Sequence, residues 1–209
     1  MADPVALPVK RLPKQTLHHA WAPKLSRTIV LAGRDQLHLW VMLEAHPGVT
    51  RYCERPSWPD ETAPYPVPDF WVLREGTPIW FALQEPASSE PGTVPVREAD
   101  PGLTTISSEA LDLHRVWIQN WLSLLPYLGP ATRPSVEALM STVIGAVGLD
   151  TSFDDVERQL PNVDPLLVRT AVISALHQGR LFSEDLHHRP WDRSTRVCVL
   201  PSRRPHAPR

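Results

Sequence analysis

Apolar positions in the first part of the chain recur with two different periods. Residues 29–46 carry apolar side chains at helical spacing, which predicts a helix after a short lead-in, and His46-Pro47-Gly48 predicts its end. Residues 49–54 instead alternate between apolar and polar side chains, which predicts a strand.

Two apolar runs follow, at residues 70–73 and 79–83, on either side of Glu75-Gly76. This pattern predicts a hairpin. Both runs are continuously apolar, so we expect burial on both faces within a central sheet.

Three segments rich in proline interrupt these elements. Residues 1–26 are also basic and predict an extended arm, residues 55–68 predict a stiff loop, and residues 85–102 predict a loop or linker. A helix over about residues 109–125, capped by Ser107 or Ser108, is predicted next, and its Trp117 and Trp121 lie four residues apart on one face. We interpret these tryptophans as core residues.

The last part of the chain predicts three helices and two short strands. The helices are expected at residues 135–147, from about 152, and at 164–179, and the strands at 181–186 and 195–200. This order is typical of a winged-helix module, which binds DNA through its third helix in some proteins and docks other proteins in others. The third helix offers a sparse polar face: Arg169, Thr170, Ser174, His177 and Gln178.

Composition indicates a soluble globular protein of 209 residues, with 42% hydrophobic and 21% charged residues. No apolar run is long enough for a membrane span, and no signal-type segment opens the chain, so we expect a cytoplasmic protein without a membrane partner. Cys53 and Cys198 are expected to be reduced thiols.

Charge is unevenly distributed. Residues 1–34 and 189–209 each hold six basic residues and one acidic residue, whereas the 154 residues between them hold 9 basic and 21 acidic residues. Basic ends on an acidic body suit contact with a polyanion or an acidic partner, or are solvated tails.

Five short motifs between residues 33 and 84 together resemble TnsA-like transposase endonucleases, a branch of the PD-(D/E)xK nuclease fold. In order they are Gly33-Arg34-Asp35, Pro47-Gly48-Val49-Thr50-Arg51-Tyr52, Arg55-Pro56, Pro68-Asp69-Phe70 and Ala82-Leu83-Gln84. The segment Leu176-His177-Gln178-Gly179-Arg180-Leu181 is similar to the winged-helix region that follows in such proteins.

The resemblance implies an α/β (α+β) fold: a mixed sheet of restriction-endonuclease type followed by a winged-helix module. The expected domains are a basic arm over 1–26, a nuclease-fold domain over 27–105, a winged-helix-like domain over 106–200 and a basic tail over 201–209.

The family's catalytic residues are mostly replaced. Gly33 stands at the position of the helix glutamate, Ala82 at the strand carboxylate and Gln84 at the lysine, and Asp69 alone is retained. Mg²⁺ sites need several oxygen ligands, so we predict no catalytic residues and no cofactor. Without partners, Asp69 is expected to cap its turn.

By resemblance, we expect a catalytically inactive subunit of a DNA transposition complex that binds transposon-end DNA, a partner transposase, or both. The implied partners are a DDE-type transposase and its ATPase regulator. Two alternatives stay open: an active Mg²⁺-dependent endonuclease with a rearranged site around Asp69, and an interaction module of a bacterial defence or regulatory system. The candidate DNA-binding residues are basic: Lys10, Arg11, Lys14, Lys24, Arg27, Arg169, Arg180, Arg203 and Arg204.

Overall fold

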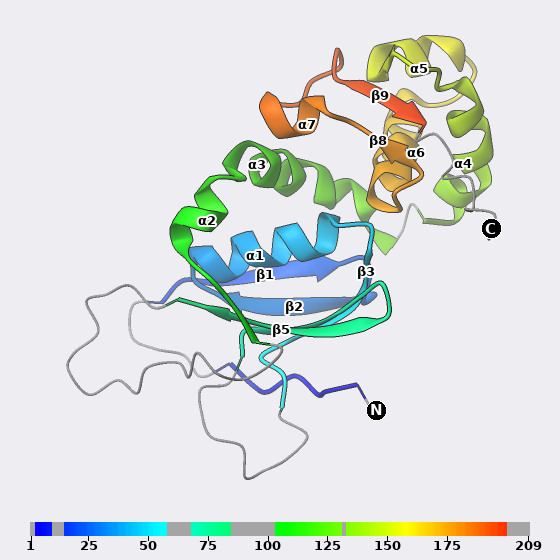
Figure 1. Ribbon diagram of the computed structural model, residues 1–209. Coiled ribbons are helices and arrows are strands. Elements are labelled where there is room, and N and C mark those ends of the chain that lie inside the picture. The colour runs from blue at the N-terminus through cyan, green and yellow to red at the C-terminus, as the bar shows by residue number, and fades with distance from the viewer. Residues whose placement is uncertain (1–2, 10–14, 58–67, 85–102, 131–132, 200–209) are drawn as a thin grey trace, which may run out of the picture. The chain divides into compact units, whose positions relative to one another are not determined.

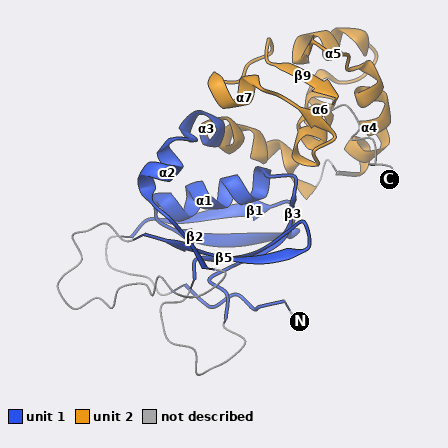
Figure 2. Cartoon of the chain, in the orientation of Figure 1, with its two compact units in different colours: residues 1–118 blue, residues 119–209 orange. Residues whose placement is uncertain are grey.

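The computed structural model describes residues 3–9, 15–57, 68–84, 103–130 and 133–199 (Figure 1). The chain divides into two compact units, residues 1–118 and 119–209 (Figure 2). Helices and strands occur in both units, so the predicted mixed α/β class is confirmed.

The first unit begins with a hairpin that the sequence did not predict. β1 (Leu17–Ala22) pairs antiparallel with β2 (Arg27–Ala32) through a tight turn. The expected arm over 1–26 and the helical start at Ile29 are therefore wrong for these residues. The run Ile29-Val30-Leu31 fits a buried strand as well as a helix, because a short apolar run carries no period that separates the two.

α1 (Arg34–Ala45) follows β2 directly and ends at His46, as the Pro-Gly step predicted. It contacts β2 and β3 and runs along one face of the first unit in Figure 1. Leu39 and Val41, which point to nearly opposite sides of the helix, are both buried, so α1 is covered on more than one side.

A four-stranded mixed sheet forms the centre of this unit, in the order β3-β4-β5-β6. The strands are β3 (Val49–Glu54), β4 (Phe70–Arg74), β5 (Thr77–Leu83) and β6 (Leu103–Ile106). The first three are antiparallel, and β6 runs parallel to β5. The predicted β4–β5 hairpin is confirmed, with positive φ at both Glu75 and Gly76, a backbone state that matches the twist of two-residue hairpins.

The helix predicted over 109–125 is broken. α2 (Ser108–Asp112) is capped by the Ser107 hydroxyl, α3 (Arg115–Leu124) follows, and a 3-10 turn, η1 (Leu125–Leu128), contains Pro126. Trp121 is buried as expected, while Trp117 is only partly buried.

The second unit contains three principal helices: α4 (Arg133–Ala146), α5 (Phe153–Gln159) and α6 (Pro165–His177). The predicted caps are present, with a Ser152–Asp155 capping box on α5 and Asp164 followed by Pro165 at the start of α6. These local signals place the helix starts where the sequence predicted them.

A small three-stranded sheet in the order β7-β9-β8 completes the second unit. Its strands are β7 (Thr151–Ser152), β8 (Leu181–Phe182) and β9 (Arg196–Val199). The strand predicted over 181–186 is only two residues long, because α7 (Asp185–His188) begins directly after it. The buried Asn120 carboxamide fixes the following loop by donating to the Leu186 and Arg189 carbonyls and accepting from Trp191 N–H.

No helix in the parts of the chain placed by the structure is long and apolar enough to cross a membrane.

Candidate functional site

Asp69 lies at the start of β4, and both of its carboxylate oxygens accept hydrogen bonds. Oδ2 accepts from the Leu83 backbone N–H at 2.7 Å, and Oδ1 accepts from the Gln36 side-chain amide at 3.1 Å. The other end of the Gln36 amide accepts from Ala32 N–H at 2.6 Å. Asp69 and Gln36 therefore tie together the end of β2, the first turn of α1, the start of β4 and the end of β5.

Ala82 in β5 and Gln84 just after it, the two other positions that the sequence analysis singled out, lie beside this group. Ala82 is buried between Phe81 and Leu83, the residues whose backbone groups bond Asp69, and Gln84 is exposed just past the strand. Neither Ala82 nor Gln84 offers a carboxylate or an amine. The scaffold thus brings the expected β4 and β5 positions together without the side chains for metal chemistry.

Gly33, which the resemblance places at the helix glutamate, lies just before α1 and not within it. Its backbone has φ 83° and ψ 171°, a region that only glycine occupies without strain. The α1 side chain that reaches Asp69 is Gln36, one turn further along the helix. The sequence analysis did not single out Gln36. The signal that could have pointed to it is helical spacing from Gly33, since residues three apart lie on one helix face.

The donor set around Asp69 does not suit Mg²⁺. A divalent cation would need oxygen ligands, but Asp69 faces two N–H donors, and the Gln36 oxygen is turned to Ala32. Among the residues that the structure describes, no group of three histidine, cysteine or acidic side chains could hold a metal ion.

A second polar group lies at the other end of α1. Glu44 is fully buried and accepts from the Tyr52 hydroxyl and from Lys24 N–H at 3.0 Å, and the Trp40 indole N–H donates to Tyr52 Oη at 2.7 Å. Lys24, from the β1–β2 turn, donates through Nζ to the Leu43 and His46 carbonyls at 2.9 and 2.6 Å. These carbonyls belong to the last turn of α1, where a cation is favourable.

Lys24 is therefore part of the fold and not of a basic arm. Burial lowers the pKa of its ammonium to about 8, although the nearby Glu44 carboxylate raises it. Between pH 8 and pH 10.5 the unfolded chain consequently binds this proton more tightly than the folded chain, and stability rises with pH across that interval.

We expect the free energy of unfolding to increase by about 1 kcal/mol between pH 7 and pH 9 through Lys24. Urea unfolding at a series of pH values measures this, with Lys24→Met as the control whose curve lacks the increase. Burial raises the pKa of the Cys53 thiol to about 11, which has the opposite effect above pH 9, so both proteins should carry Cys53→Ala. Parallel curves for the two proteins would show that Lys24 keeps an ordinary pKa.

Two of the other candidate cations are also engaged within the fold. Arg27 makes a bidentate pair with the buried Glu54 carboxylate at 2.7 and 2.6 Å. Arg169, on α6, donates from Nε and Nη2 to Glu157 of α5 at 2.9 and 2.7 Å. Carboxylates already balance the charges of both arginines, so each would have to give up its ion pair to bind a phosphate.

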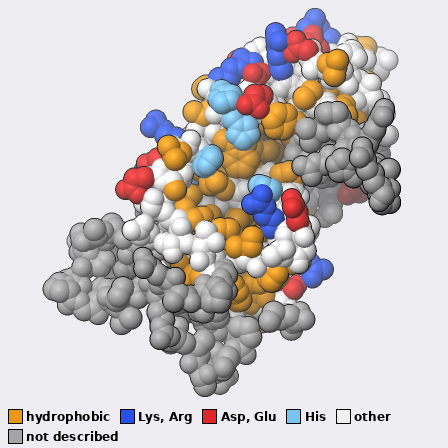
Figure 3. Space-filling view, viewed as in Figure 1, with side chains coloured by type: hydrophobic (Ala, Val, Ile, Leu, Met, Phe, Trp, Pro, Cys, Tyr) orange, Lys and Arg blue, Asp and Glu red, His pale blue; other side chains and the backbone are white. Residues whose placement is uncertain are grey.

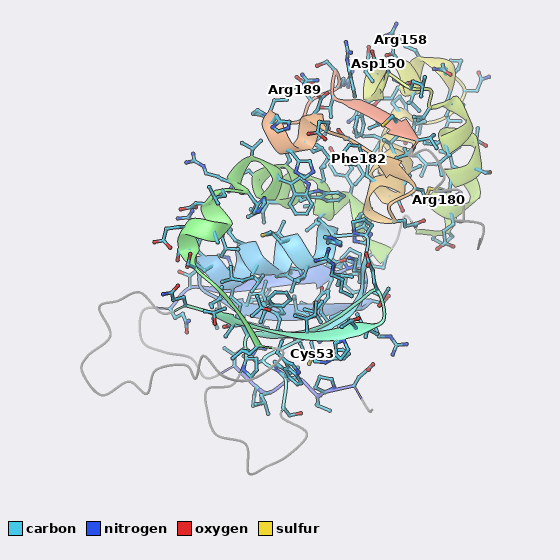
Figure 4. The ribbon with its side chains drawn as sticks, in the orientation of Figure 1. Cys53, Asp150, Arg158, Arg180, Phe182 and Arg189 are labelled. Atoms are coloured by element: carbon cyan, nitrogen blue, oxygen red, sulfur yellow. The ribbon has the colours of Figure 1, made fainter. Side chains whose placement is uncertain are left out.

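Arg180 lies exposed past the end of α6 and is the remaining candidate that the structure places (Figure 4). The basic side chains around α5 and β9 are interleaved with acidic ones, as Figure 3 shows for one face. Arg158–Asp155 and Arg196–Asp150 are exposed ion pairs, and Arg189–Asp185 is a partly buried one. The other predicted contacts, Lys10, Arg11, Lys14, Arg203 and Arg204, lie outside the described residues.

α6 has little surface for reading a DNA groove. From Val168 to His177 every residue is buried except Arg169 and Ser174, which are partly buried. The polar face predicted for this helix is thus mostly internal: the Thr170 hydroxyl donates to the Leu166 carbonyl at 2.8 Å.

Comparison with known proteins gives no relatives: no protein-family model matches the chain, and no curated protein matches it.

Proposed function

We propose that this protein is a TnsA-like subunit of a DNA transposition complex whose nuclease-type scaffold has lost its chemistry and acts by binding. The observation that carries the proposal is the Gln36–Asp69 hydrogen bond. A neutral amide donates to the one carboxylate of the family pattern, and an amide N–H group repels a cation where a metal-dependent nuclease needs an oxygen ligand.

The arrangement of the first unit supports the nuclease-type scaffold. α1 precedes a mixed sheet in which β4 and β5 are adjacent and antiparallel, so residues that open β4 and close β5 meet. This is the juxtaposition of Asp69 with Ala82 and Gln84 that the resemblance implies.

Element order in the second unit supports a winged-helix module. β7 lies between the first two helices, and β8 and β9 follow the third, with β9 in the middle of the sheet. α6 is largely buried, and the basic residues around α5 and β9 are paired with acidic ones. We therefore propose that this module contacts a protein, the partner transposase or its ATPase regulator, and does not recognise DNA bases. DNA contact in this proposal comes from the basic ends of the sequence.

Metal binding tests the inactive site. Millimolar Mn²⁺ should leave the melting temperature of the wild-type protein unchanged, because the described neighbours Gln36 and Leu83 present N–H donors to the Asp69 carboxylate and not oxygen ligands. The double variant Gln36→Glu with Ala82→Glu places carboxylates on both sides of Asp69 and should gain a Mn²⁺-dependent rise. A ligand at 100 times its dissociation constant adds about 2.7 kcal/mol of stability, which thermal unfolding detects easily.

The matched control is Gln36→Met with Ala82→Glu. It removes the same hydrogen bond from the Gln36 amide but adds only one carboxylate, so it should not gain the Mn²⁺-dependent rise. A Mn²⁺-dependent rise in the wild-type protein that disappears in Asp69→Asn, together with nicking of plasmid DNA, would establish the active endonuclease instead. Membership of a transposition complex is checked separately, by co-purification with a transposase if one is encoded beside this gene. A gene neighbourhood without a transposase would favour the defence or regulatory alternative.

A further inference from the structure

The N-terminal segment, residues 3–9, lies against the chain that continues β3. Leu7 N–H donates to the Arg55 carbonyl and Ser57 N–H donates to the Val5 carbonyl, each at 2.8 Å. Ala6 and Pro56 form an antiparallel bridge between these bonds. The segment is thus an added antiparallel strand, although it contains too few paired residues to count among the named strands.

Side chains reinforce this pairing at its ends. Arg55 Nε donates to the Leu7 carbonyl at 3.1 Å, and Ser57 Oγ accepts from Val5 N–H at 3.2 Å. The Asp3 carboxylate pairs with Arg51 at 2.8 Å, in an exposed position. Recognition therefore rests on backbone groups and on one acidic residue opposite Arg51.

Apolar packing contributes little to this contact. Val5 is 72% exposed and Leu7 is 38% exposed, whereas Val9 is partly buried, so the segment buries only part of its apolar surface. A strand held by few hydrogen bonds and little buried apolar area belongs to the least stable part of a fold. Its exposed valine and leucine gain burial only when something else covers them.

We propose that the edge formed by residues 55–57 is a strand-addition site for an extended peptide of a partner protein, with an acidic residue for Arg51, and that residues 3–9 occupy it in cis until such a peptide displaces them. Displacing residues 3–9 would free the Arg55 C=O and the Ser57 N–H for strand addition, and the cis segment shows the register. This site rests on the proposed function in one respect: it is where a protein partner of the complex would dock.

A peptide in solution must compete with residues 3–9 for the edge. A cis segment competes at an effective concentration on the order of millimolar, so a free peptide with the same contacts binds the wild-type chain weakly. Weakening the cis pairing should therefore strengthen binding in trans by the same factor.

The probe is a fluorescent nine-residue peptide with the sequence of residues 1–9, and the readout is its anisotropy with full-length protein. Leu7→Pro in the protein removes the N–H that bonds Arg55, and we expect it to bind the peptide about tenfold more tightly than the wild-type chain does, the ratio for 1.4 kcal/mol. The matched control is Leu7→Ala in the protein, which keeps the N–H and should behave like the wild type. A peptide that itself carries Leu7→Pro should not bind.

Equal binding by the three proteins, or no binding by any of them, overturns the proposal. Hydrogen exchange on the unmodified protein gives an independent check. The amides of Leu7 and Ser57 should exchange on the order of 100 times faster than that of Val72 in the central strand β4, and equal protection would mean that the segment is a fixed part of the sheet. Neither result depends on metal binding or cleavage, so failure here leaves the inactive-site test untouched.

Discussion

Replacing Arg169 by alanine should lower the free energy of unfolding by about 3–5 kcal/mol. The Arg169 and Glu157 side chains are only 14% and 8% exposed, and two guanidinium N–H groups donate to one carboxylate oxygen. Removing the cation leaves the Glu157 carboxylate buried without its partner, and the desolvation of that charge is then uncompensated. Urea unfolding followed by circular dichroism measures the loss.

The chain supplies a matched control for this variant. Arg158 pairs with Asp155 at 2.6 Å, but its side chain is 69% exposed, so Arg158→Ala should cost less than about 1 kcal/mol. Small and equal losses for Arg158→Ala and Arg169→Ala would contradict the structural role of the Arg169–Glu157 pair. A stable Arg169→Ala protein with reduced affinity for DNA would return this arginine to the candidate DNA contacts.

Replacing Gly33 by alanine should cost about 1–3 kcal/mol, because φ 83° with ψ 171° is accessible only to glycine without strain. The surroundings do not limit the change, since a Cβ at this position meets only the Gln15 side chain, at 4.0 Å. Thermal unfolding of Gly33→Ala against the wild-type protein gives the effect.

Gly145 is the control for this backbone argument. It lies in α4, is exposed, and has no heavy atom within 4 Å of a built Cβ. Gly145→Ala should therefore stabilise the protein by up to about 1 kcal/mol through helix propensity. If Gly33→Ala were also stabilising, the Gly33 backbone would be an ordinary one and the strain argument would be wrong.

The elements that the sequence predicted well are those with local signals. The Glu75-Gly76 turn, the capping box at Ser152 and the proline at the start of α6 each act within a few residues, and the structure has all three. β1 lacks such a signal, because the segment before it is rich in proline and its turn has no glycine. β6 owes its place to a parallel partner distant in the sequence, a pairing that local pattern does not encode.

The candidate site was predicted in part for a related reason. The order of the short motifs singled out Asp69, Ala82 and Gln84, and in the structure Asp69 bonds to the backbone of Phe81 and Leu83 on either side of Ala82. Gln36 was missed because its partner Asp69 is 33 residues away and the motif placed the helix position at Gly33. The three-dimensional structure was needed to see that Gly33 has a backbone suited to glycine and that the Gln36 side chain reaches Asp69.

The parallel pairing of β6 with β5 also sets an order of events when the chain folds. β3, β4 and β5 are antiparallel, and the β4–β5 turn is two residues long, so the β4–β5 pair closes a small loop. Because β6 is parallel to β5, the chain must return to the end of the sheet where β5 begins before β6 can pair. Closing this longer loop costs entropy and delays the pairing. We therefore expect the three antiparallel strands to form the kinetic nucleus and the free edge of β5 to stay exposed longest during refolding.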